Sequence, residues 1–173
     1  METCHLLLET RRAEATRAVG AALGRRLRNG DVLALAGDLG TGKTVLTQGL
    51  AAGMGITAAV TSPTFVLVNR YRAADGRVLH HADCYRLADA PAEMWDIGLG
   101  DLISDEDILV IEWADRIPGL LPEAFLEVRL EYVDENCRRL CFVAHGARYV
   151  DLLAELAAAL PTCSEDVIHV IGA

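Results

Sequence analysis

Basic residues are scarce in this 173-residue sequence. It holds 16 Lys and Arg against 25 Asp and Glu, which gives a formal net charge of −9. A protein that binds nucleic acid unaided neutralises the phosphates with clusters of Lys and Arg. The composition disfavours such binding, so we expect any RNA involved in the function to be held by a partner protein.

Long uninterrupted hydrophobic runs are missing as well. Residues 45–69 carry no charge, but Gly49, Gly53 and Pro63 interrupt the stretch. It therefore predicts a buried helix, a polar loop and a strand rather than a membrane span. Residues 1–8 lack the basic start and the apolar core of a secretory signal. We expect a soluble, cytoplasmic protein that does not enter a membrane.

A disulfide framework is also lacking. The five cysteines are odd in number and follow no framework spacing. Cys137 and Cys141 lie close together in the sequence, but no Cys or His pair nearby completes a zinc site. Reduced thiols in the cytosol are the expected state.

Hydrophobic residues, in contrast, make up 52% of the chain, and no internal repeat or linker occurs. A chain of this length buries about 70% of its unfolded surface and most simply forms one domain. Residues 1–173 are therefore predicted to be a single domain with a compact core.

Residues 37–44 read Gly-Asp-Leu-Gly-Thr-Gly-Lys-Thr and match the phosphate-loop pattern G-x-x-x-x-G-K-[ST] at every specified position. The apolar run 31–36 before it predicts a buried strand, and residues 45–52 after it predict a helix that ends near Gly53. Strand, glycine loop and helix are the context that this motif requires, because the loop amides and the helix N-terminus together bind phosphate. The sequence therefore predicts a nucleoside triphosphate site.

The residues expected to bind the nucleotide are those of the loop and the first turn of the helix. They are Asp38, Leu39, Gly40, Thr41, Gly42, Lys43, Thr44 and Val45. Lys43 would reach the β- and γ-phosphates, and the hydroxyl of Thr44 would bind Mg²⁺.

An acidic residue ends a second apolar run, residues 107–113, which read Asp-Ile-Leu-Val-Ile-Glu-Trp. A strand of this kind lies beside the phosphate loop in such proteins, and its acid, here Glu112, holds the Mg²⁺ water shell or orients the attacking water. A simple cap to the next turn is the structural alternative. Another strand, residues 77–83, delivers His81 and Asp83 to its far end, where Asp83 is either a cap or a ligand.

Residues 57–65 place three hydroxyl groups, those of Thr61, Ser62 and Thr64, around a proline. Ser, Thr and Pro are common in ordinary connections. The functional alternative is a loop that senses the γ-phosphate and its metal, as switch loops do.

The other segments predict a mixed sheet with helices. In the N-terminal part we expect an edge strand at 5–8 and a helix at 11–28 capped by Thr10. A hairpin of strands 65–71 and 77–83 should follow, and then a helical region at 90–102 with Trp95 and Asp96. In the C-terminal part we expect a hairpin of strands 124–132 and 139–144 and a helix at 149–160 stopped by Pro161. The apolar piece 167–171 in the tail receives no role. The expected fold class is α/β, a phosphate-loop NTPase-like three-layer fold with a mixed parallel and antiparallel sheet.

Four strings, at residues 37–44, 61–65, 81–87 and 111–113, occur together in this order. In combination they closely resemble the bacterial TsaE (formerly YjeE) family, the small ATPase of tRNA threonylcarbamoyladenosine biosynthesis. The resemblance spans residues 6–144, whereas the C-terminal helix and tail, residues 148–173, carry no matching motif. The phosphate loop alone is shared by many families, but its combination with the other strings is specific.

The resemblance implies that Lys43, Asp83 and Glu112 are catalytic and that Thr44, Asp83 and Glu112 act at Mg²⁺. It further implies that Trp113 lies close to ATP. The loop of residues 57–65, called the hydroxyl loop below, would be switch-like. Proteins of the family bind a complex of TsaB and TsaD and support its turnover by hydrolysing ATP, so tRNA would be met only through that complex. An arginine finger would come from Arg86 or from the partner, and weak hydrolysis is expected without the partner.

Other functions share the phosphate loop. A small-molecule kinase needs an acceptor pocket and a lid, and no lid insertion is obvious in the sequence. A guanine-nucleotide switch normally carries Asn-Lys-x-Asp, which is absent, so ATP is favoured over GTP. A structural subunit with bound nucleotide is a third alternative, against which Thr44, Asp83 and Glu112 argue.

Overall fold

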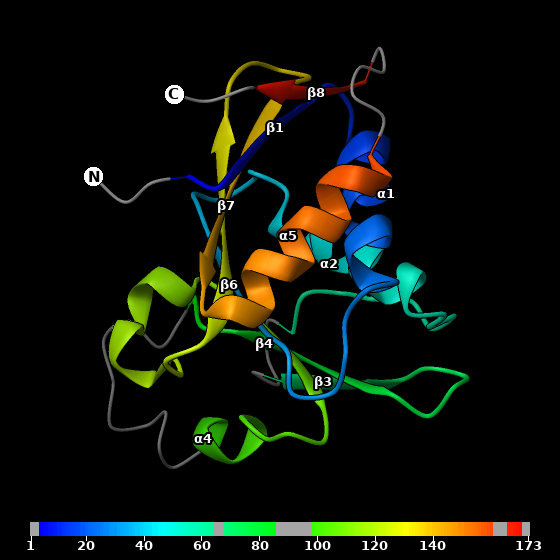
Figure 1. Ribbon diagram of the computed structural model, residues 1–173, viewed down its shortest axis with the longest axis vertical. Helices are drawn as coiled ribbons and strands as arrows, with labels where there is room; N and C mark the ends of the chain where they lie inside the picture. The colour runs from blue at the N-terminus through cyan, green and yellow to red at the C-terminus, as the bar shows by residue number, and fades with distance from the viewer. Residues whose placement is uncertain (1–3, 64–67, 86–97, 161–165, 171–173) are drawn as a thin grey trace.

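The computed structural model describes residues 4–63, 68–85, 98–160 and 166–170, and one eight-stranded sheet organises them, in the order β3-β4-β5-β2-β6-β7-β1-β8 (Figure 1). The strands are β1 (Leu6–Thr10), β2 (Val32–Ala36), β3 (Val68–Arg72), β4 (Val78–Asp83), β5 (Ile108–Glu112), β6 (Phe125–Tyr132), β7 (Arg138–His145) and β8 (Val167–Val170). The helices are α1 (Ala13–Gly24), α2 (Lys43–Gly53), α4 (Leu99–Leu102) and α5 (Ala147–Ala159), with the 3-10 turns η1 (Ala114–Arg116) and η2 (Pro118–Leu120).

The centre of the sheet is parallel and its flanks are antiparallel. Strands β4, β5, β2 and β6 run parallel, while β3 pairs antiparallel with β4, and β7, β1 and β8 continue antiparallel from β6. Every residue of β2 and β5 is buried, as expected for parallel strands covered on both faces. The expected α/β class with a mixed sheet is confirmed.

Helices α1, α2 and α5 lie together on one face of the sheet (Figure 1) and bury the larger hydrophobic core. On the opposite face, η1 contributes to a smaller core that includes Ala34, Leu109, Ile111 and Trp113. Strand β6 alternates between half-buried and fully buried side chains over most of its length, because one of its faces packs on the helices and the other is more open.

Helices α1 and α2 approach each other so closely that their backbones touch. A Cβ atom built on Gly20 of α1 would lie 3.0 Å from the Cα of Gly49 in α2, and one built on Gly49 would overlap the carbonyl oxygen of Arg17. Gly24 and Gly53 face the partner helix in the same way. The glycines of these helices therefore serve close packing rather than a turn.

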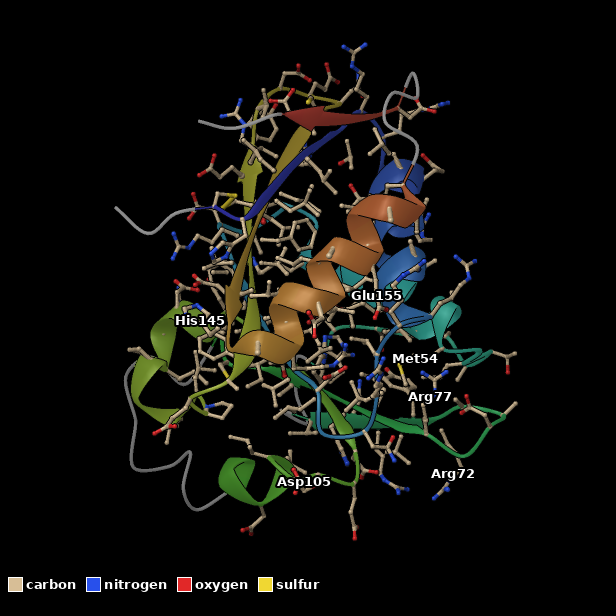
Figure 2. The ribbon with its side chains drawn as sticks, in the orientation of Figure 1. Met54, Arg72, Arg77, Asp105, His145 and Glu155 are labelled. Carbon is tan, nitrogen blue, oxygen red and sulfur yellow. A yellow bond between two sulfur atoms is a disulfide. The ribbon has the colours of Figure 1, made fainter. Side chains whose placement is uncertain are left out.

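The β3–β4 hairpin is anchored to the helical layer by an arginine that follows its turn. Arg77 Nη1 donates to the carbonyl oxygen of Leu27 over 2.8 Å, and Arg77 Nη2 donates to that of Met54 over 3.5 Å. Figure 2 shows Arg77 close to Met54 at the end of α2. The hairpin expected around Asp75-Gly76 is confirmed in its described part, residues 68–85, and residues 64–67 lie outside the described part.

Three predictions about the N-terminal region are wrong. The first strand is not an edge strand, because β8 pairs with it on the side away from β7, and this pairing also gives the apolar tail piece its place. Thr10 does not cap the first helix: it is the last residue of β1, its hydroxyl bonds that of Thr16 over 2.7 Å, and Arg12 takes the N-cap position. The helix ends at Gly24, short of the expected Arg28, because the backbone N–H of Arg26 bonds to the carbonyl oxygen of Leu23 and the Arg26 guanidinium occupies that of Ala22 over 2.6 Å.

The cysteines also differ from expectation. Cys4 and Cys141 form a disulfide across a sequence separation of 137 residues, whereas Cys84 and Cys137 are free and buried. The pairing of β1 with β7 brings the two sulfurs together, and spacing in the sequence gives no sign of it. The expectation of reduced thiols throughout is therefore wrong for this pair.

The remaining expected elements are confirmed with small shifts in their bounds. They are the strand and helix around residues 37–44, the strand that ends in Glu112, the β6–β7 hairpin and helix α5. Of the expected helical region 90–102, only α4 falls within the described residues, so Trp95 and Asp96 lie outside them. Among the described residues, no helix is both long enough and apolar enough to cross a membrane.

Candidate nucleotide-binding site

The loop 37–42 connects the end of β2 to the start of α2 and forms an open cradle. Gly37, Gly40 and Gly42 all have positive φ, at 135°, 80° and 101°. A Cβ atom built on Gly40 or Gly42 would meet no atom within 4 Å, whereas one on Gly37 would collide with the carbonyl oxygen of Leu130. The loop is thus held tightly at its first glycine and is free of obstruction beyond it, where the N-terminus of α2 offers unpaired backbone N–H groups.

A cavity of about 490 Å³ lies over this cradle. It is lined by Leu39, Gly40, Gly42, Lys43, Thr44, Val45, Ser62, Pro63, Asp83, Tyr85, Glu112 and Trp113. Its walls therefore come from the loop and α2, from the ends of β4 and β5, and from the hydroxyl loop. Strands β4 and β5 deliver their acids to the same place because they are parallel neighbours and Asp83 pairs with Glu112 in register.

Lys43 is the sole lysine of the chain and is only 5% exposed. Its Nζ donates to the carbonyl oxygens of Gly37, over 2.5 Å, and Asp38, over 2.9 Å, and lies 3.8 Å from the ring centroid of Trp113. Burial lowers the pKa of this ammonium below its ordinary value, opposed by the negative charges of Glu112 and nearby aspartates. The ammonium is therefore weakly solvated, held by neutral oxygens, and lies at the floor of the cavity.

Two hydroxyl–carboxylate pairs face the cavity. Thr44 Oγ1 donates to Glu112 Oε2 over 3.1 Å, and Ser62 Oγ donates to Asp83 Oδ2 over 2.6 Å. The second oxygen of Asp83 accepts the backbone N–H of Tyr85 over 2.9 Å. Two carboxylates and two hydroxyls thus meet beside the N-terminus of α2, a set of hard oxygen ligands that suits Mg²⁺.

The described residues contain no group of three or more His, Cys, Asp or Glu side chains that could hold a metal ion. Mg²⁺ is ordinarily held by one or two carboxylates together with phosphate oxygens and water, not by an all-protein cage. The donor set of Thr44, Asp83 and Glu112 fits that pattern.

Trp113 closes one wall of the cavity in an unusual backbone conformation. Its φ is 60°, the one positive value at a non-glycine residue in the described part of the chain. A bulky residue adopts this region only when its surroundings hold it there, at a cost of about 1–3 kcal/mol. The surroundings are Lys43 on the ring, the ring of Tyr85 at 4.9 Å and the guanidinium of Arg116 at 4.6 Å. Such strain is typical of functional sites.

The structure brings together nearly all of the residues that the sequence singled out. Leu39, Gly40, Gly42, Lys43, Thr44, Val45, Asp83, Glu112 and Trp113 all line the cavity. Asp38 and Thr41 belong to the same loop but support it from behind, where the Thr41 hydroxyl donates to the carbonyl oxygen of Asp38 over 2.8 Å. Thr64 and Arg86 lie outside the described residues.

Sequence reasoning assigned no role to His81, Tyr85 or Arg116. His81 is completely buried and contacts Glu112, and Arg116 packs on both Tyr85 and Trp113. The position of His81 two residues before Asp83 on a strand placed both side chains on one face, which was a usable signal. The positions of Tyr85 and Arg116 depend on loop geometry, which a sequence pattern does not reveal.

Comparison with known proteins supports the same assignment. Residues 10–140 match the family model described as threonylcarbamoyl adenosine biosynthesis protein TsaE. A protein of Bacillus subtilis strain 168 named tRNA threonylcarbamoyladenosine biosynthesis protein TsaE is 39% identical over 144 residues, 83% of this chain and 88% of that protein. A protein of the same name from Haemophilus influenzae is 40% identical over 121 residues, 70% of this chain and 68% of that protein.

The fold has a solved counterpart. The crystal structure of YdiB from Bacillus subtilis superposes with a TM-score of 0.77 at 32% sequence identity, covering 91% of this chain and 98% of that one. The four sequence strings, the phosphate-loop cavity that they line and the match over residues 10–140 agree: this chain belongs to the TsaE family.

Proposed function

We propose that this protein binds ATP with Mg²⁺, hydrolyses it slowly, and thereby supports a TsaB–TsaD complex in threonylcarbamoyladenosine modification of tRNA. One observation carries the proposal: Lys43, Thr44, Asp83 and Glu112 converge on a single cavity over an open glycine cradle. The names of the relatives add the pathway, tRNA threonylcarbamoyladenosine biosynthesis.

The residues of the cradle bind the triphosphate. Backbone N–H groups of the loop and the first turn of α2 donate to phosphate oxygens. Lys43 exchanges its two carbonyl acceptors, on Gly37 and Asp38, for the more negative oxygens of the β- and γ-phosphates. Because burial has already removed much of its hydration, this ammonium gives up little water when phosphate arrives.

The residues beside the cradle position the metal and the water. Mg²⁺, when bound, neutralises charge on the phosphate oxygens. The Thr44 hydroxyl and the carboxylates of Asp83 and Glu112 hold that ion and its water shell, and Glu112 or Asp83 orients the attacking water. The hydrogen bond from Ser62 to Asp83 couples the hydroxyl loop to this group, as a γ-phosphate-sensing loop requires.

We expect slow hydrolysis because no arginine of the described residues lines the cavity. An arginine finger raises turnover by about 10³–10⁵ in phosphate-loop enzymes. We infer that the TsaB–TsaD complex, or Arg86 on formation of the complex, supplies it. With a net charge of −9, the protein meets tRNA only through that partner, and it works in the cytoplasm, where tRNA is modified.

The decisive test is Mg²⁺-dependent phosphate release from ATP, measured with and without added TsaB–TsaD complex. We expect weak activity alone, a clear rise with the complex, and loss of both in Lys43→Ala. Full activity without the partner would contradict the proposed dependence. Phosphate transfer to a small-molecule acceptor in place of water would contradict the proposed function and favour a kinase.

Binding can be measured separately from hydrolysis because Lys43 is the single lysine. Protein labelled with ¹⁵N-lysine gives one backbone amide signal, which arises from the first residue of α2 within the cradle. We expect this signal to shift and saturate as Mg²⁺-ATP is added. A signal that does not move at any ATP concentration would contradict binding at this loop.

A further inference from the structure

His81 occupies a position in the core that packing alone does not explain. It lies in β4 with 0% exposure, and its Nε2 is 2.8 Å from Glu112 Oε1 on the neighbouring strand β5. Its other ring nitrogen, Nδ1, is buried without a hydrogen-bond partner. An unsatisfied buried polar atom destabilises the fold, a cost that an aliphatic residue at this position would avoid.

We propose that His81 is the positioning residue of Glu112: it fixes the carboxylate that the proposed hydrolysis uses to hold the metal shell or the water. The inference rests on the proposed function, because the role of Glu112 does. His81 itself touches neither the nucleotide nor the reacting water.

The two oxygens of Glu112 are held by different kinds of partner. Oε1 meets His81, and Oε2 accepts the hydroxyl of Thr44 over 3.1 Å. Under the proposed function the Thr44 hydroxyl would bind Mg²⁺, so its bond to Oε2 would be given up in the loaded site. The bond from His81 then remains, and it limits rotation of the carboxylate plane about its terminal torsion, which is soft by itself.

The partners of this bond sit on rigid elements. Strands β4 and β5 are parallel neighbours at the centre of the sheet, with His81 opposite Val110 and Asp83 opposite Glu112. His81, Asp83 and Glu112 therefore point to the same face of the sheet, the face that carries α2. A ligand oriented by a buried partner on a strand is held more precisely than one on a loop.

The geometry also assigns the hydrogen on the ring. A carboxylate oxygen accepts hydrogen bonds, so a hydrogen of the ring lies on Nε2, facing Glu112 Oε1. Since Nδ1 has no partner, His81 has no route along which to pass a proton further. It orients Glu112 and does not act as a proton relay.

The neighbouring histidine offers a matched control. His80 Nε2 is also 2.8 Å from a carboxylate oxygen, Asp107 Oδ2, and also lies in β4. Because side chains alternate along a strand, it points to the opposite face, away from α2. It does not line the cavity.

The variants to compare are His81→Leu, His81→Gln and His80→Leu, each assayed for Mg²⁺-ATP affinity and for turnover with the partner complex. We expect His81→Leu to lower kcat by about 10- to 100-fold, the usual cost of losing a group that orients a metal ligand, with little change in the Kd for ATP. Gln carries an N–H that can replace Nε2–H, so His81→Gln should recover most of the lost kcat. His80→Leu should keep wild-type kcat.

Wild-type kcat in His81→Leu would overturn the proposal, as would equal losses of kcat in the His80 and His81 variants.

A double-mutant cycle tests whether His81 acts through Glu112. If it does, His81→Leu should cost little further activity once Glu112→Gln is present, because coupled residues are not additive. Equal losses in both backgrounds would overturn the proposal. Should His81→Leu fail to fold, His81→Gln in the two backgrounds gives the same comparison.

A second readout needs no activity. Long-range ¹H–¹⁵N spectra of the ligand-free protein should show His81 as a single Nε2–H tautomer that is lost in Glu112→Ala. A Nδ1–H tautomer, or a tautomer unaffected by Glu112→Ala, would overturn the inference even if ATP is hydrolysed. If the wild-type protein does not hydrolyse ATP but shows this tautomer, the proposed function fails and the orienting bond stands.

Discussion

Glu127 illustrates how single residues in this fold hold charge away from bulk water. Its side chain is half-buried in β6, where Arg129 Nε donates to Oε1 over 2.6 Å and His145 lies 3.2 Å from Oε2. The ring of His145 stacks on Phe125 with centroids 4.2 Å apart, which orients it toward the carboxylate. Burial alone would raise the pKa of Glu127, but these hydrogen bonds outweigh it and the pKa lies below its ordinary value of 4.5.

This shift predicts an acid-sensitive contribution to stability. A carboxyl group whose folded pKa lies below its unfolded pKa stabilises the fold above the unfolded value and loses that contribution as pH falls through the folded one. We expect Glu127→Gln to lower the free energy of unfolding at pH 7 and to leave it nearly unchanged relative to wild type at the acid end, below the lowered pKa of the folded state. Urea titrations across the acid range would measure this difference. The exposed Glu123, replaced by Gln, is the control, and an identical pH profile for the two variants would contradict the prediction.

At the scale of elements, the junction of α1 with α2 shows tertiary packing overriding helix propensity. Alanine stabilises an isolated helix by about 1 kcal/mol relative to glycine. In this protein the glycines lie where two helix backbones meet, and a Cβ on Gly49 would overlap the carbonyl oxygen of Arg17. The overlap is with backbone, which cannot rotate away.

Gly49→Ala is therefore expected to destabilise the protein in spite of its better propensity. Overpacking of this kind costs about 1–3 kcal/mol, and because α2 carries the phosphate loop at its start, nucleotide affinity should fall as well. Chemical denaturation and ATP titration measure the two effects. Gly119→Ala is the matched control, since a Cβ there meets no atom within 4 Å and φ at that position needs no glycine. If Gly49→Ala proved as stable as this control, the close-packing argument would be wrong.

At the scale of the whole molecule, the disulfide between Cys4 and Cys141 ties the N-terminal strand to β7 across 137 residues of chain. Closing a loop of this length restricts the unfolded chain, and disulfides typically stabilise by about 2–4 kcal/mol. Such a bond does not favour a cytoplasmic location, where thiols are kept reduced. The free thiol of Cys84 does not compete for it, because burial raises its pKa to about 12 and a thiol is unreactive in exchange.

We expect reductant to lower the urea midpoint of the wild-type protein and to leave that of Cys4→Ser unchanged. The drop should correspond to about 2–4 kcal/mol, because the unfolded chain regains its freedom. Thiol trapping followed by mass spectrometry would report the state of the pair in cells. A midpoint that reductant shifts equally in both proteins would show that the stabilisation does not come from this bond.

Local chemistry in the sequence determined much of this protein. The glycine loop ending in Lys43 and Thr44, the apolar strand that ends in Glu112 and the hairpin turn at Asp75-Gly76 are each specified by residues close together in sequence. Phosphate binding, strand burial and tight turns demand particular side chains at short spacing, so these features can be read directly from the chain.

Only the tertiary structure decided which distant residues meet. The bond from His81 to Glu112, the contact of Gly49 with α1, the pairing of β8 with β1 and the Cys4–Cys141 disulfide all join segments far apart in the chain. Such contacts arise from packing and strand order, whose energies depend on the whole fold and leave no periodic mark in the sequence. The sequence alone thus determined the chemistry of the candidate site, and the fold decided what holds that chemistry in place.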